Sequence, residues 1–203
     1  ENSKVPIIET GTGNCHAFID ETADVQMAAE IIYNAKCSRP SVCNALETLL
    51  VHEKAAEKAL PVVAEKLRQK KVKIFGCETT RSILGQEVEP ATEKEYETEF
   101  LDYVLAIKVV KDINEALDHI QRYSSGHSEC IITQNKENAE NFLHRVDSAA
   151  VYVNASTRFT DGNEFGFGAE IGISTQKLHA RGPMGISQLT SMKYIIHGDG
   201  NIR

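Results

Sequence analysis

The sequence lacks the features that mark several large classes of protein. It has no run of about 18 apolar residues, which excludes a membrane span. Basic residues are in the minority, with 22 Lys and Arg against 29 Asp and Glu, and a net charge of −7 argues against a nucleic-acid partner. Two phosphate-binding patterns, GxGxxG after a strand and GxxxxGK[ST], are also missing. If the protein uses a dinucleotide, we therefore expect most of that binding site to lie outside this chain.

Cysteine is sparse as well. The five cysteines contain no CxxC pair, so neither a metal site nor a dense disulfide framework is indicated. Their odd number favours a reducing, cytoplasmic compartment and one special thiol rather than a bridge. The five are Cys15, Cys37, Cys43, Cys77 and Cys130.

Strand-like and helix-like patterns alternate along the chain, and this alternation predicts an α/β fold. Repeated strand–helix–strand units indicate a three-layer αβα arrangement around a mostly parallel sheet. A polar, Glu-rich connection precedes the most apolar strand. The predicted strands are Cys15–Asp20, Leu46–His52, Val72–Phe75, Tyr103–Val110, Glu129–Thr133 and Ala149–Val153, and the predicted helices are Asp24–Lys36, Lys54–Lys71, Ile113–Tyr123 and Lys136–Val146.

The regular alternation ends after Asn154. A Gly-rich stretch over residues 156–185 is too long to be an ordinary connection, and such loops on an α/β scaffold usually line a site. The tail over residues 187–203 is predicted to form a short helix, a strand at Met192–His197 and a Gly-Asp-Gly turn.

Several segments, in order, resemble the aldehyde dehydrogenase superfamily. Residues 7–14 (IIETGTGN) are similar to its Glu-Leu-Gly-Gly-Lys-Asn segment, and Glu9 precedes Cys43 by about 34 positions, as the glutamate precedes the nucleophilic cysteine in that superfamily. Residues 99–107, 149–154 and 165–168 resemble three further blocks of the superfamily. The resemblance implies the fold of an aldehyde-dehydrogenase catalytic domain.

Other blocks are closer to the gamma-glutamyl phosphate reductase family within that superfamily. They are residues 39–50 (RPSVCNALETLL), 154–162 (NASTRFTDG) and 168–174 (GAEIGIS), continuing to 179–183 (HARGP). The resemblance covers nearly the whole chain. It implies a catalytic domain over residues 1–186 and a C-terminal oligomerisation arm over 187–203, with the N-terminal cofactor-binding domain absent from this chain.

The activity implied is NADPH-dependent reduction of L-glutamyl 5-phosphate to L-glutamate 5-semialdehyde, with release of phosphate, in proline biosynthesis. Cys43 would be the nucleophile and would pass through a thioester, because a thiolate is a good nucleophile and its thioester accepts hydride readily. Cys37 is the only rival. The backbone N–H of Cys43, next to Asn44, would help hold the oxyanion. Glu9 stands at the general-base position of aldehyde-oxidising relatives, but a reductase needs no hydrolytic water, so a structural or cofactor-side role is the alternative.

The same resemblance implies binding roles for residues in the later loops. Glu99 would contact the nicotinamide-side ribose of NADP(H), unless it is simply solvated among neighbouring glutamates. The guanidinium of Arg158 can grip the substrate's phosphate or carboxylate in bidentate fashion, and Arg181 is a second candidate, although either can be an ordinary surface charge. The implied substrate-binding residues are Ser156, Thr157, Arg158, His179 and Arg181.

Two other hypotheses remain open. One is another acylating or oxidising aldehyde dehydrogenase of the same superfamily. The other is an assembly fragment that is catalytically inert as an isolated chain. The resemblance further implies a homo-oligomer formed through the C-terminal strand and a functional link to glutamate 5-kinase; it implies no metal.

Overall fold

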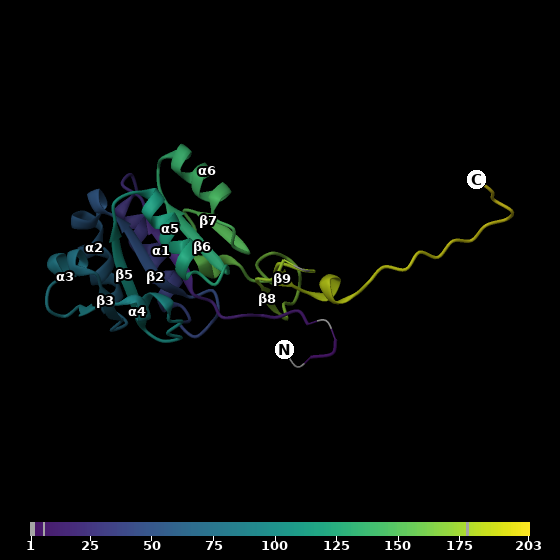
Figure 1. The fold of residues 1–203 in the computed structure, drawn as a ribbon, viewed down its shortest axis with the longest axis horizontal. Coiled ribbons are helices and arrows are strands. Elements are labelled where there is room, and N and C mark those ends of the chain that lie inside the picture. The colour runs from purple at the N-terminus through teal and green to yellow at the C-terminus, as the bar shows by residue number, and fades with distance from the viewer. Residues whose placement is uncertain (1–2, 6, 178) are drawn as a thin grey trace.

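The computed structural model describes residues 3–5, 7–177 and 179–203. Seven strands of this part of the chain form one parallel sheet in the order β4-β3-β5-β2-β1-β6-β7 (Figure 1). The strands are β1 (Cys15–Ile19), β2 (Leu46–His52), β3 (Lys73–Gly76), β4 (Glu89–Pro90), β5 (Val104–Val110), β6 (Ser128–Ile132) and β7 (Ala150–Val153). The α-helices are α1 (Val25–Cys37), α2 (Glu53–Arg68), α3 (Glu78–Leu84), α4 (Glu93–Glu97), α5 (Ile113–Tyr123) and α6 (Lys136–Arg145).

Helices cover both faces of the sheet. In the interior strand β1, Ala17 and Ile19 lie in the core that α1 and α2 cover, whereas Phe18 lies in the core that α5 and α6 cover. Successive side chains of a strand point to opposite faces, so a strand buried on both sides is mostly apolar along its whole length. The predicted three-layer αβα architecture with a mostly parallel sheet is confirmed.

Side-chain caps explain where two of the helices begin. Helix α1 follows Asp24, whose Oδ1 accepts a hydrogen bond from the backbone N–H of Met27 at 2.8 Å. Helix α5 follows Asp112, whose Oδ1 accepts from the N–H groups of Asn114 and Glu115 at 2.9 and 3.0 Å. Each cap satisfies N–H groups that have no partner inside the helix and stabilises it by about 1 kcal/mol.

The Glu-rich connection is more ordered than the sequence prediction allows, since it contains α3, β4 and α4. Helix α4 begins with a capping box, in which the backbone N–H of Thr92 donates to Glu95 Oε2 at 2.7 Å. Tyr96 of the same helix is buried. The Thr-x-x-Glu pattern was a usable signal, but five residues are too few for a clear helical period.

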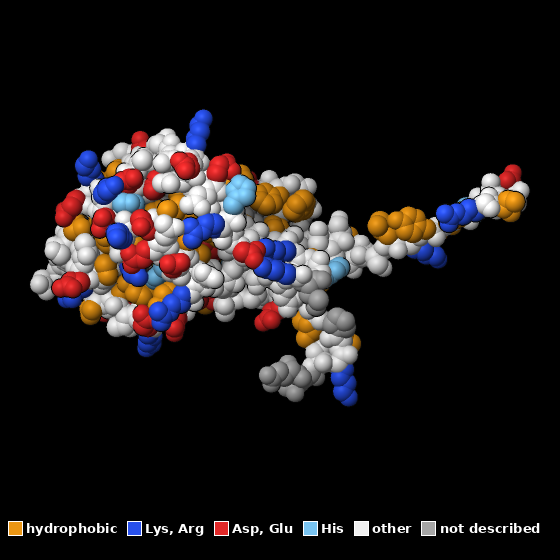
Figure 2. Space-filling model, turned by 45° about the horizontal axis from the view of Figure 1, so that its top comes forward, with side chains coloured by type: hydrophobic (Ala, Val, Ile, Leu, Met, Phe, Trp, Pro, Cys, Tyr) orange, Lys and Arg blue, Asp and Glu red, His pale blue; other side chains and the backbone are white. Residues whose placement is uncertain are grey.

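The loop after β7 contains short elements and then a long tail. The elements are the 3₁₀ turns η1 (Thr157–Phe159) and η2 (Ile186–Leu189), and the antiparallel pair β8 (Gly172–Ser174) and β9 (Gly182–Met184). Residues 191–203 extend away from the body, with hydrophobic side chains along their length (Figures 1 and 2). The strand predicted at Met192–His197 is not formed, because a strand needs a neighbour and the described chain offers none here.

None of the helices in the described part of the chain is both long and apolar enough to cross a bilayer.

Candidate active site

Cys43 lies at the edge of the sheet where the parallel strands start. It precedes β2 and is flanked by the segments that lead into β1 and β5. A Cβ placed on Gly13 would lie 1.5 Å from the carbonyl oxygen of Cys43. The thiol of Cys15 donates a hydrogen bond to the same oxygen at 3.2 Å. The segment that leads into β1 therefore packs directly against the backbone of Cys43.

Exposure separates Cys43 from most of the other cysteines. Cys15, Cys37 and Cys130 are buried, while Cys43 and Cys77 are partly exposed. Burial also raises the pKa of the Cys37 thiol to about 11. Since the thiolate is the reacting species, Cys37 is a poor rival to Cys43.

The surroundings of Cys43 hold its thiol protonated. Burial raises its pKa, and the negative charges of Glu170 and Glu99 raise it further. The backbone N–H of Cys43 and the guanidinium of Arg158 act in the opposite direction. The balance of these effects places the pKa of the Cys43 thiol above its ordinary value.

The loop after β7 holds Asn44, the residue after Cys43. Asn44 Nδ2 donates to the carbonyl of Thr160 at 2.8 Å, and the hydroxyl of Thr157 donates to the carbonyl of Asn44 at 2.7 Å. Arg158 Nη1 donates to Asn44 Oδ1, and Ser156 Oγ accepts from the backbone N–H of Arg158 at 3.2 Å. The Asn44 side chain is buried and its amide is engaged at both ends, so it is placed to position Arg158 rather than to meet an oxyanion.

Glu99 joins this group from the segment before β5. Its Oε1 accepts from the backbone N–H of Gly13 at 2.8 Å, and the residue is only half-buried. A carboxylate that keeps one side toward solvent can accept hydrogen bonds from sugar hydroxyls, so Glu99 fits the ribose contact expected of it.

Glu9 is exposed, and no contact of the described chain brings it to Cys43. Its backbone N–H donates to Gln176 Oε1 at 3.1 Å, just beyond β8.

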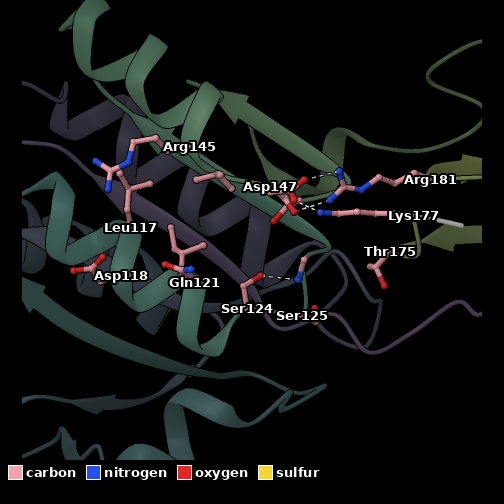
Figure 3. A pocket seen from close by; sticks show the side chains of 14 residues that line it. Leu117, Asp118, Gln121, Ser124, Ser125, Arg145, Asp147, Thr175, Lys177 and Arg181 are labelled. Atoms are coloured by element: carbon pink, nitrogen blue, oxygen red, sulfur yellow. Dashed lines mark hydrogen bonds and ion pairs between the residues drawn. The ribbon is translucent and has the colours of Figure 1, made fainter.

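Arg181 and His179 lie at a different place. Arg181 Nη1 donates to Asp147 Oδ1 at 2.8 Å, and Nη2 donates to the Asp147 carbonyl at 2.6 Å. Figure 3 shows Arg181 and Lys177 both pointing at Asp147, beside a cavity of about 490 Å³ that Ser124 and Ser125 also line. The ring of His179 is exposed and bonds the Gln188 carbonyl at 2.9 Å. The residues predicted to bind substrate thus fall into two groups, and only the group of Arg158 contacts the neighbourhood of Cys43.

In parallel sheets, ligands more often bind at the edge where the strands end. At that edge of this sheet, polar side chains are engaged in hydrogen bonds with one another. The buried carboxylate of Asp20 accepts from the hydroxyls of Thr22 and Thr133 at 3.0 and 2.6 Å and from Asn138 Nδ2 at 3.1 Å. A carboxylate with these donors already in place is a structural group, so we locate the site at the Cys43 edge.

Glu129 is a buried acid that the sequence reasoning missed, although a charged residue in an apolar strand was a usable signal. Its Oε1 accepts from Ser124 Oγ at 2.5 Å, whereas Oε2 has no hydrogen-bond partner among the described protein atoms. Burial raises the pKa of Glu129 to about 7, and the hydrogen bond from Ser124 and the charge of Arg181 offset this effect only in part.

We expect Glu129 to make stability depend on pH. Because its pKa in the folded state lies above that in the unfolded state, its contribution to stability is full at pH 4 and is lost as the pH rises through 7. The unfolding free energy of the wild type should therefore fall from pH 5 to pH 8 by up to about 3 kcal/mol more than that of Glu129→Gln. Urea unfolding at both pH values measures it. Glu57→Gln, on the exposed side of α2, is the control, and an equal difference at both pH values would contradict the prediction.

In the described residues no cluster of three or more His, Cys, Asp or Glu side chains is arranged to hold a metal ion.

Comparison with known proteins places this site in a family. Residues 92–195, about half of the chain, match the sequence model of the aldehyde dehydrogenase family. The chain belongs to that family. The match includes Glu99, Arg158 and both residues of the second group.

Individual relatives resemble the whole chain. A curated protein of Thermoanaerobacter pseudethanolicus named gamma-glutamyl phosphate reductase is 64% identical, over 100% of this chain and 49% of that protein. The crystal structure of gamma-glutamyl phosphate reductase from Thermotoga maritima is 57% identical, with a TM-score of 0.93, and the match covers 100% of this chain and 49% of that one. An acetylating aldehyde dehydrogenase from Geobacillus thermoglucosidasius shares 19% identity with a TM-score of 0.73, over 99% of this chain and 54% of that one, a likeness of the aldehyde-dehydrogenase fold alone. This chain therefore spans about half the length of the curated relatives it matches.

Proposed function

We propose that this chain is the catalytic part of a reductase that converts L-glutamyl 5-phosphate to L-glutamate 5-semialdehyde in proline biosynthesis, using NADPH and releasing phosphate. The relatives named gamma-glutamyl phosphate reductase, which are 57% and 64% identical over the whole of this chain, support the choice of substrate. The observation that carries the proposal is Cys43 itself: a partly exposed thiol whose backbone is held by Gly13 and Cys15, with Arg158 within electrostatic range.

The chemistry proceeds at the Cys43 sulfur. The thiolate attacks the acyl carbon of the substrate, the bond from that carbon to the phosphate oxygen breaks, and a thioester remains. Bound NADPH supplies the hydride that reduces this thioester. Hydride addition gives the thiohemiacetal oxyanion, whose carbon–sulfur bond then breaks, which restores the Cys43 thiolate and releases the aldehyde. The backbone N–H of Cys43 stabilises the oxyanion that forms in each addition step.

Arg158 binds the anionic substrate next to the sulfur. Its Nη1 is held by Asn44 and the residue is partly exposed, so the rest of the guanidinium keeps hydrogen-bonding capacity toward a ligand. A phosphate or carboxylate bound there is oriented by a charge-assisted, directional contact. Ser156 and Thr157 shape the turn that presents Arg158, through the bonds described above.

Glu99 holds the cofactor by accepting a hydrogen bond from a ribose hydroxyl, since its carboxylate is already fixed by Gly13 and half-exposed. Most of the cofactor site belongs to a domain outside this chain. Glu9 has no place in the reduction, because no water has to be activated; its side chain is exposed and its backbone N–H bonds Gln176. Arg181 lines the cavity beside Asp147, and His179 lies in the β8–β9 hairpin.

The tail over residues 187–203 is the assembly arm, beyond the catalytic domain of residues 1–186. Met192 and Ile196 are more than four-fifths exposed, which a soluble tail would not sustain without a partner. Pairing of Met192–His197 with a strand of a second copy would satisfy its backbone and cover these side chains.

The test compares substrates in the protein that joins this chain to its cofactor-binding domain. NADPH oxidation should be fast with L-glutamyl 5-phosphate and at least ~10²-fold slower with a simple acyl-CoA, because only the first substrate carries a phosphate directly on the reacting acyl carbon, where Arg158 can bind it. The reverse preference would favour another acylating dehydrogenase. The isolated chain should show no turnover, and NADPH-dependent reduction by it alone would contradict the assignment of the cofactor site to another domain.

A further inference from the structure

Lys36 and Glu47 form an ion pair that is fully enclosed by the protein. Lys36 Nζ lies 2.7 Å from Glu47 Oε2, and both side chains are 0% exposed. Lys36 is in the last turn of α1, and Glu47 is in β2, close behind Cys43. Apolar side chains of similar size often stabilise a protein as well as such a pair does, so stability alone does not explain it.

The second carboxylate oxygen of Glu47 holds a turn of the backbone. Oε1 accepts from the N–H of Leu101 at 3.4 Å, and the N–H of Phe100 also stabilises the carboxylate. Leu101 has φ 57°, a left-handed conformation that a leucine rarely adopts. Such a turn persists only when its surroundings hold it in place.

The turn in question carries Glu99. Glu99 Oε1 accepts from the N–H of Gly13, and Gly13 lies against the carbonyl of Cys43. An unbroken series of contacts therefore runs from the buried ion pair through the turn to the backbone of the nucleophile.

We propose that Lys36 and Glu47 are positioning residues for the active site: their ion pair fixes the Phe100–Leu101 turn, and the turn fixes Glu99 against Gly13 and Cys43. Lys36 orients the Glu47 carboxylate, and Glu47 Oε1 is the acceptor that holds the turn. The inference rests on the proposed role of Cys43 as nucleophile, but its test needs no turnover.

Two double variants separate the acceptor from the charge. Lys36→Met/Glu47→Gln removes both charges and keeps an acceptor for the turn. Lys36→Met/Glu47→Leu removes both charges and the acceptor. Urea unfolding of each double variant tests whether it is folded and whether the two differ in unfolding free energy.

The readout is the electrostatic coupling of Glu99 to the Cys43 thiol. In the wild-type chain, Glu99→Gln removes a negative charge that raises the pKa of the Cys43 thiol, and it should speed alkylation of that thiol by iodoacetamide at pH 7.5 roughly threefold. Mass spectrometry reports Cys43 and Cys77 separately in the same chain, so Cys77 serves as the internal control.

Glu99→Gln should retain its roughly threefold effect in the Lys36→Met/Glu47→Gln background and lose it in the Lys36→Met/Glu47→Leu background, with Cys77 unchanged in both. If the Lys36–Glu47 pair only stabilised the fold, the effect of Glu99→Gln on Cys43 alkylation would be the same in two folded variants. If Glu99→Gln has its full effect in the Glu47→Leu background, the proposal is overturned. Failure of the proposed function would show instead as turnover that persists without Cys43, so the two failures are distinguishable.

Discussion

Replacing Cys43 with alanine is expected to lower the rate of NADPH-dependent reduction of L-glutamyl 5-phosphate by at least ~10³-fold, because the thioester forms on the sulfur of this residue. Cys37 is buried with a pKa raised to about 11, and Cys15 and Cys130 are wholly enclosed. The measurement is kcat/KM from NADPH absorbance, in the protein that includes the cofactor-binding domain.

Cys77→Ser is the matched control, because Cys77 is the other partly exposed cysteine and lies at the start of α3. It should keep its activity within a few-fold. Activity that survives in Cys43→Ala, or that disappears in Cys77→Ser while the fold is intact, would move the nucleophile away from Cys43.

Gly13→Ala is expected to damage both the site and the fold. The added Cβ would lie 1.5 Å from the Cys43 carbonyl oxygen, 2.3 Å from its carbonyl carbon and 2.7 Å from its Cα, all of them backbone atoms that no rotamer change can move. The backbone has to shift by roughly an ångström or more, and a misplacement of that size can cost ~10²-fold in rate. The overpacking should also lower the unfolding free energy by about 1–3 kcal/mol.

Gly11→Ala is a near-neighbour control, since its Cβ would meet only Thr175 Oγ1, at 3.7 Å, an ordinary van der Waals contact. Urea unfolding and the rate of Cys43 alkylation, measured on both variants, report stability and site geometry separately. Equal behaviour of the two variants would show that the contact between Gly13 and Cys43 is not needed for the geometry of the nucleophile.

Local patterns predicted the regular elements well. The bounds of β2 and α5 were predicted to the residue, because each is a single uninterrupted run of one pattern, and the structure shows Asp112 capping the start of α5. The short elements of the Glu-rich connection were missed, since their formation depends on packing against β3 and on caps rather than on a long period. The strand predicted in the tail is absent because a strand requires a partner that the described chain does not supply.

The sequence by itself determined the class of fold, the family and the choice of Cys43, because each is written in contiguous residues: alternating apolar periods, and blocks such as the one around Cys43. Only the tertiary structure decided which of the other site residues meet. Arg158 bonds Asn44, whereas Arg181 is held by Asp147 at the cavity that Lys177 also lines. Gly13, Glu99 and the Lys36–Glu47 pair converge on Cys43 from segments far apart in sequence. The physical reason is that such contacts depend on the order of the strands in the sheet and on which strand ends share an edge, and local periodicity carries no information about either.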